Sequence, residues 1–171
     1  MAQLRDKDGL TEAEFLANYD ASRYPRPSVT VDIAVFTPIG GRLCVLLIRR
    51  GGHHFLGSWA LPGGFIDMDE DLPRAAQREL REETSLDGLP LVQLGAFGAP
   101  GRDPRTRIVT VAYLALAPRG SVSPRAGDDA ADAQWFAVEI QAAPEPNRRR
   151  LLLAGPATLA IEAQLGHDGL A

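Results

Sequence analysis

Residues 64–86 read GFIDMDEDLPRAAQRELREETSL, the most informative stretch of the sequence. Asp71 is a preferred N-cap residue, Pro73 is tolerated in a first helical turn, and good helix formers continue to Thr84. The stretch therefore predicts a helix that begins after Asp71. Just upstream, residues 59–65 (WALPGGF) predict a short strand that runs into a turn.

The acidic residues of this predicted helix lie close together. At about 100° per residue, Glu79, Glu82 and Glu83 occupy a sector of about 100° within one turn. Like charges three and four residues apart repel each other, so the helix gains nothing from them unless a cation binds. Oxygen ligands of this kind suit Mg²⁺, with Mn²⁺ as the alternative, and such ions commonly bridge to substrate phosphates. Arg78 can pair with Glu82 or Glu70 and hold a carboxylate in one orientation.

An exposed helix carrying Glu–Arg salt bridges is the alternative, and on charge alone it is the more common case. The spacing of the other residues favours a metal site. The stretch resembles the signature of the Nudix hydrolases, which runs Gly, five residues, Glu, seven residues, Arg-Glu, aliphatic, any residue, Glu-Glu, any residue, Gly, aliphatic. Its positions are filled here by Gly64, Glu70, Arg78, Glu79, Leu80, Glu82, Glu83 and Leu86, while Ser85 replaces the second glycine.

The resemblance implies an α/β (α+β) fold, the Nudix-type α/β/α sandwich with a mixed sheet between helices. It also implies a Mg²⁺-dependent hydrolase that cleaves the diphosphate of a nucleoside diphosphate linked to another moiety, by attack of water on phosphorus. The implied metal ligands are the Gly63 carbonyl and the carboxylates of Glu79, Glu82 and Glu83, with Glu70 and Arg78 as orienting partners. A non-catalytic nucleotide sensor is the alternative, although a sensor has no need of all three carboxylates.

Such a hydrolase also needs a general base. Glu79 is one candidate, and Asp103, Asp128 and Asp129 are others because they fall in predicted loops. The sequence leaves these alternatives open.

The predicted loop at residues 98–107 carries three arginines, Arg102, Arg105 and Arg107. Guanidinium groups suit phosphate oxygens, and prolines would stiffen the loop that presents them. Local Asp–Arg pairs in a hairpin connection are the alternative. The loop and the strand after it resemble the ADP-ribose pyrophosphatase-like branch of the family, so we expect an ADP-ribose-like substrate. Arg49, at the end of a predicted strand, is a further candidate for substrate binding.

We expect one domain over residues 1–171, with a core at about 28–140 and an N-terminal extension at 1–27. The extension contains a capping box, Thr11 with Glu14, that predicts a short helix. Apolar patterning predicts strands at residues 28–36, 43–48, 91–97, 108–116 and 133–138, and a C-terminal helix at about 157–166.

Composition limits the classes of function. The lone Cys44 excludes an intramolecular disulfide framework and a multi-cysteine zinc site. A net charge of −4 argues against nucleic acid as a partner. No apolar run is long enough to span a membrane, and the N-terminus lacks the apolar segment of a secretory signal. We therefore expect a cytoplasmic protein with a small-molecule nucleotide substrate and no membrane partner; a homodimer is possible.

Overall fold

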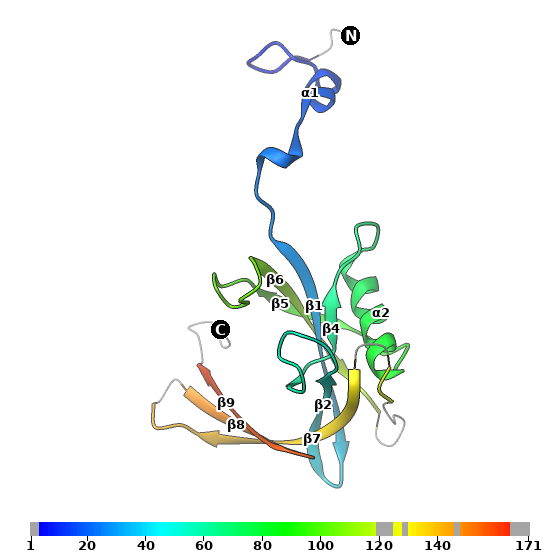
Figure 1. The fold of residues 1–171 in the computed structure, drawn as a ribbon, viewed down its shortest axis with the longest axis vertical. Helices are drawn as coiled ribbons and strands as arrows, with labels where there is room; N and C mark the ends of the chain where they lie inside the picture. The colour runs from blue at the N-terminus through cyan, green and yellow to red at the C-terminus, as the bar shows by residue number, and fades with distance from the viewer. Residues whose placement is uncertain (1–3, 119–124, 128–129, 146–147, 165–171) are drawn as a thin grey trace.

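The computed structural model describes residues 4–118, 125–127, 130–145 and 148–164 (Figure 1). Its elements in chain order are α1 (Glu12–Asn18), a 3-10 turn (Ala21–Arg23), β1 (Ser28–Ile39), β2 (Arg42–Arg50), β3 (Trp59–Ala60), β4 (Gly63–Phe65), α2 (Leu72–Thr84), β5 (Val92–Phe97), β6 (Ile108–Leu116), β7 (Ala130–Ala142), β8 (Arg148–Ala154) and β9 (Thr158–Gln164). The predicted α/β class is confirmed.

The strands form one mixed sheet. Its order is β5-β6-β1-β2-β7-β8-β9, with β3 paired to β2 and β4 paired to β1. Strands β1 and β6 run parallel, whereas the other described pairs are antiparallel. The predicted mixed sheet is therefore confirmed, and β1 lies inside it between β6 and β2.

One face of the sheet packs against α2. Alternate residues of β1, Val31, Ile33 and Val35, are fully buried, as the apolar alternation predicts. They share a core cluster with Ala76 and Leu80 of α2. This packing holds the helix that carries the acidic residues across the centre of the sheet (Figure 1).

The other face of the sheet has a second cluster of buried residues. Strand β2 is buried on both faces, and its Val45 and Leu47 pack with Phe136 of β7 and Leu153 of β8. Strands therefore supply the cover on this side of β2. Figure 1 shows β8 and β9 curving away from the centre of the sheet.

The predicted C-terminal helix at 157–166 is wrong, because β9 occupies Thr158–Gln164 and pairs antiparallel with β8. Ala, Leu, Glu and Gln favour a helix locally, but propensity is weak beside tertiary packing. Leu159 packs into the second cluster with Leu153. A Cβ at Gly155 would lie 2.7 Å from the Phe136 ring, so the turn between the strands lies directly against the core.

The N-terminal extension is separate from the sheet. Helix α1 begins at the predicted capping box, in which the Thr11 amide donates to Glu14 at 2.7 Å and the Glu14 amide donates to Thr11 Oγ1 at 3.3 Å. Helix α1 has no buried residue of its own and lies apart from the sheet (Figure 1). Within the described residues, neither helix is long and apolar enough to cross a membrane.

Helix α2 begins and ends as the sequence predicts. Its N-cap Asp71 accepts a hydrogen bond from the Arg74 amide at 3.1 Å. It ends at Ser85, whose φ of 59° and ψ of 18° are left-handed. The Gly127 amide donates to the Glu83 carbonyl at 3.3 Å, so the chain before β7 contacts the end of the helix.

Candidate functional site

Two glycines of β4 bring backbone against the acidic helix. Strand β4 pairs with β1, and Gly63 adopts a φ of +152°. A Cβ at Gly63 would lie 2.1 Å from the carbonyl oxygen of Val31, so a side chain does not fit there. A Cβ at Gly64 would lie 2.6 Å from Oε1 of Glu79. The missing side chain of Gly63 therefore allows β4 to lie against β1, and that of Gly64 allows the carboxylate of Glu79 to lie against β4.

The three carboxylates of α2 have different surroundings. Glu83 is buried, and its Oε2 accepts a hydrogen bond from the Gly63 amide at 2.8 Å. Glu79 is 13% exposed, and burial raises the pKa of its carboxyl although Arg78 opposes the shift. Glu82 is 35% exposed. Glu79 and Glu83 both line the neighbouring cavity, whereas Glu82 does not.

Arg78 joins the other acidic residues. Its Nη1 donates to Glu79 Oε1 at 2.7 Å and to Glu82 Oε2 at 3.0 Å, and its Nε donates to Glu70 Oε2 at 3.1 Å. The guanidinium lowers the pKa of the Glu70 carboxyl, and Glu70 in turn raises the pKa of Arg78. Nη2 also donates to the Phe65 carbonyl, so Arg78 ties α2 to the end of β4. These contacts fix the orientation of the carboxylates.

Among the described residues, no group of three or more His, Cys, Asp or Glu is arranged to hold a metal. The contacts above explain this, because Glu79 and Glu82 turn to Arg78 while Glu83 turns to the Gly63 amide. The donor chemistry still fits a hard divalent cation. Carboxylate oxygens from adjacent turns and backbone oxygens of β4 are the ligands that Mg²⁺ prefers.

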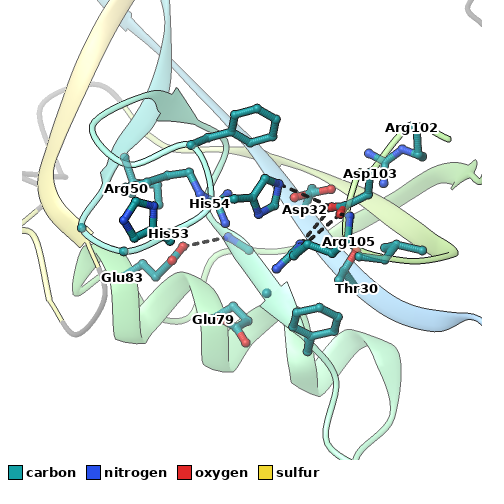
Figure 2. Close-up of a pocket in the computed structure, with 18 residues that line it drawn as sticks. Thr30, Asp32, Arg50, His53, His54, Glu79, Glu83, Arg102, Asp103 and Arg105 are labelled. Atoms are coloured by element: carbon teal, nitrogen blue, oxygen red, sulfur yellow. Dashed lines mark hydrogen bonds and ion pairs between the residues drawn. The ribbon is translucent and has the colours of Figure 1, made fainter.

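The cavity beside the carboxylates has a volume of about 510 Å³. Figure 2 shows Glu79 and Glu83 along one side of it, with loop residues around the rest. The loop side chains come from residues 51–58 and 98–107 and are mostly charged or aromatic. The loop residues labelled in Figure 2 are His53, His54, Arg102, Asp103 and Arg105. Arg50, the last residue of β2, also lines the cavity.

The structure brings two of the four predicted substrate arginines to this cavity. Arg102 and Arg105 line it, whereas Arg49 and Arg107 do not. The Nε of Arg49 donates instead to the Gly57 carbonyl at 3.2 Å, which ties together the ends of the 51–58 loop.

Arg105 already has a carboxylate partner. Its Nε and Nη2 donate to Asp103 at 3.0 and 2.9 Å, and the guanidinium lies 5.2 Å from the ring centroid of Phe65. Arg105 holds the pKa of the Asp103 carboxyl well below its usual range. The alternative of a local Asp–Arg pair is therefore present in the structure. A phosphate at Arg105 would have to compete with Asp103.

Asp32 and His54 also line the cavity, although the sequence did not predict either as a site residue. Asp32 lies on β1, and its Oδ2 accepts a hydrogen bond from Thr110 Oγ1 at 2.5 Å. An acidic residue inside a valine-rich strand is a sequence signal for a site residue. Only the pairing of β1 with β6 and β4, however, places Asp32 in the cavity. Of the loop candidates for a general base, Asp103 lines the cavity, while Asp128 and Asp129 lie outside the described residues.

Similarity to proteins of known function agrees with this geometry. The chain is 45% identical over 108 residues to the ADPR responsive transcriptional repressor NtrR of Acinetobacter baylyi, covering 62% of this chain and 43% of that protein. It is 39% identical over 94 residues to the ADP-ribose pyrophosphatase of Methanocaldococcus jannaschii, covering 54% of this chain and 53% of that protein. The chain thus spans about half, or less, of these relatives.

Solved structures share the fold. The NUDIX domain of Shewanella oneidensis NrtR complexed with ADP ribose matches with a TM-score of 0.68 at 40% identity, covering 75% of this chain and 84% of that chain. A MutT/nudix family protein from Enterococcus faecalis matches with a TM-score of 0.75 at 33% identity, covering 99% of this chain and 68% of that chain. The NUDIX domain family model matches residues 26–154, so this chain belongs to the Nudix family.

Proposed function

We propose that this chain is a Mg²⁺-dependent hydrolase that cleaves the diphosphate of a nucleoside diphosphate linked to another moiety, with ADP-ribose as the favoured substrate. The main support for the proposal is the contact between β4 and α2. Gly63 and Gly64 lie directly against Glu83 and Glu79, at the edge of a cavity lined by arginines.

A divalent cation would be held by the carboxylates of Glu79, Glu82 and Glu83 and by the carbonyl of Gly63, with Mn²⁺ as an alternative to Mg²⁺. When bound, such an ion neutralises diphosphate charge and acidifies a water molecule. Arg78 would orient Glu79 and Glu82, since it already donates to both.

Substrate binding would use the arginines of the cavity. Within the described residues, Arg102 has no ion-pair partner, so its guanidinium group is available to a phosphate. Arg105 would bind more weakly while Asp103 holds it. The similarity to the Methanocaldococcus pyrophosphatase and to the ADP-ribose complex of Shewanella NrtR supports ADP-ribose as the substrate.

A non-catalytic ADP-ribose sensor is the second candidate. It is favoured by the 45% identity to a repressor described as responsive to ADPR. A solved structure of Shewanella NrtR complexed with a 27mer DNA also matches, with a TM-score of 0.53 over 64% of this chain. Because that relative binds DNA, the expected lack of a nucleic-acid partner stays a prediction. The cytoplasmic location is likewise a prediction. The three carboxylates support the hydrolase over the sensor.

A hydrolysis screen tests the proposal. Purified protein with Mg²⁺ or Mn²⁺ is incubated with ADP-ribose, NADH, nucleoside triphosphates, nucleotide sugars and dinucleoside polyphosphates, and the products are separated by ion-exchange chromatography. We expect AMP and ribose 5-phosphate from ADP-ribose. Absence of product from every substrate would reject the hydrolase. Calorimetric binding of ADP-ribose without turnover would then favour the sensor.

A further inference from the structure

His54 places a ring nitrogen in the cavity wall without a protein partner. The residue lies in the loop between β2 and β3, and its side chain is 21% exposed. Its Nδ1 is buried and has no hydrogen-bond partner among the described residues. The ring packs against Phe55 with centroids 4.2 Å apart, which limits how it can turn. Figure 2 shows the imidazole between the acidic helix and the 98–107 loop.

Asp103 faces the opposite nitrogen of the same ring. Its Oδ2 lies 3.8 Å from Nε2 of His54, which is longer than a hydrogen bond but within the range of electrostatic attraction. The carboxyl of Asp103 is ionised because Arg105 donates two side-chain hydrogen bonds to it. An ionised carboxylate only accepts hydrogen bonds, so it favours the imidazole tautomer that carries its proton on Nε2.

This tautomer leaves Nδ1 as a buried acceptor that lacks a donor. Burial of an unsatisfied acceptor is unfavourable, so a ligand that offers a donor at this point is favoured. Fully ionised phosphate groups at neutral pH offer acceptors only, whereas the hydroxyls of a sugar can donate. An acceptor at Nδ1 of His54 therefore favours a sugar hydroxyl over a fully ionised phosphate.

We propose that Nδ1 of His54 accepts a hydrogen bond from a hydroxyl of the distal sugar, which the diphosphate joins to the nucleoside. His54 is then a specificity-determining residue, which favours nucleoside diphosphate sugars over nucleotides that end in a phosphate. Toward His54, Asp103 is a positioning residue, because it selects the tautomer that leaves Nδ1 as the acceptor. This inference rests on the proposed function, since it assigns one part of that substrate.

The test compares two ligands that differ in the presence of the distal ribose. The α,β-methylene analogues of ADP-ribose and ADP contain a P–C–P link that resists cleavage, so their dissociation constants can be measured by calorimetry with Mg²⁺. We expect wild-type protein to prefer the ADP-ribose analogue. His54→Phe keeps a ring beside Phe55 but has no acceptor, and it should reduce the preference about five- to tenfold.

Two further variants separate the hydrogen bond from packing. His54→Asn places an amide oxygen near the position of Nδ1 and should keep most of the preference. His53→Phe makes the same change one residue away, in the same cavity wall, and should leave the preference unchanged. An unchanged ratio in His54→Phe, or an equal loss in His53→Phe, would overturn the inference. Wild-type protein that binds neither analogue would instead contradict the proposed function itself.

Discussion

The backbone amide of Gly63 donates a hydrogen bond to Oε2 of Glu83 across 2.8 Å. The two residues lie in different elements, Gly63 in β4 and Glu83 in the last turn of α2, and Glu83 is buried. This contact joins β4 to the end of the helix. It therefore fixes the position of the backbone beside the carboxylates on which the proposed chemistry depends.

Glu83→Gln is expected to abolish metal-dependent turnover and leave the fold intact. Glutamine keeps an oxygen that can accept from the Gly63 amide, but it removes the negative charge that a divalent cation needs. We expect product formation from ADP-ribose to fall at least about a hundredfold, with the far-UV circular dichroism spectrum unchanged. Glu139→Gln, an exposed acid of β7, is the control. Retained activity in Glu83→Gln would mean that the metal lies elsewhere.

The two glycines of β4 should respond differently to alanine. At Gly63, the new Cβ would meet the backbone oxygen of Val31 at 2.1 Å, so the strand itself must move. We expect a loss of stability of about 2–4 kcal/mol, measured by urea denaturation. At Gly64, the Cβ would meet the side-chain carboxylate of Glu79 at 2.6 Å, and no backbone atom is among its nearest neighbours. That variant should lose less than about 1 kcal/mol but most of its turnover.

Two results would contradict these expectations, one for each variant. If Gly64→Ala kept full turnover, the position of Glu79 would not matter to the reaction. If Gly63→Ala were as stable as wild type, the close approach of β4 to β1 would not constrain the turn.

Local signals made much of this fold predictable from the sequence. The alternation of apolar residues in β1 and the N-cap at Asp71 depend on neighbouring residues, and both elements lie where they are expected. Strand β9 depends instead on its pairing with β8 and on contact with Phe136, which is distant in the chain. Its helix-forming composition therefore gave the wrong element.

The same distinction applies to the site. Glu79, Glu82 and Glu83 share one helix, so their spacing alone placed them together. His54 and Asp103 belong to two loops that are adjacent only in space. Neither loop has a periodic pattern that could predict which side chains enter the cavity. Arginines of the 98–107 loop were predicted as a group, although only two line the cavity.

Arg102→Ala should weaken substrate binding more than it slows the chemical step. Arg102 lines the cavity and has no ion-pair partner among the described residues, so its loss removes a cation available to the diphosphate. We expect the KM for ADP-ribose to rise about tenfold with little change in kcat, measured by initial rates. Arg107→Ala, in the same loop but outside the cavity lining, is the control. An unchanged KM in Arg102→Ala would remove this residue from the substrate site.

Arg105→Ala tests the remaining arginine of the loop. Because Asp103 already occupies its guanidinium, substrate gains less from Arg105 than from Arg102. We expect the KM for ADP-ribose to rise, by a smaller factor than in Arg102→Ala and by more than kcat falls. Initial rates over a range of substrate concentrations give both constants. A larger increase than in Arg102→Ala would indicate that the Asp103 pair opens when substrate binds.

The Asp103–Arg105 pair should make stability depend on pH in a defined direction. The folded-state pKa of Asp103 is depressed, so the pair stabilises the fold at neutral pH and loses this effect as the pH falls and the carboxyl becomes protonated. Asp103→Asn should therefore be less stable than wild type at pH 7, by about 1 kcal/mol or less for a pair near the surface. The difference should shrink below about pH 4.

Urea denaturation at several pH values measures this difference. Asp69→Asn, an exposed acid in the turn before α2, is the control for removing one negative charge. A constant difference between wild type and Asp103→Asn across the acidic range would show that the pair has no linkage to folding.

Ser85→Gly is expected to stabilise the protein without changing its activity. Ser85 ends α2 in a left-handed conformation, with φ of 59°, where a side chain is unfavourable and glycine is preferred. We expect a gain of about 1 kcal/mol, or roughly 2–4 °C in Tm by calorimetry for a chain of this length. Ser85→Ala is the matched control, because it keeps the Cβ and removes only the hydroxyl that donates to the Arg125 carbonyl at 3.4 Å. If alanine and glycine had equal effects, the hydroxyl rather than the backbone would determine stability at this helix end.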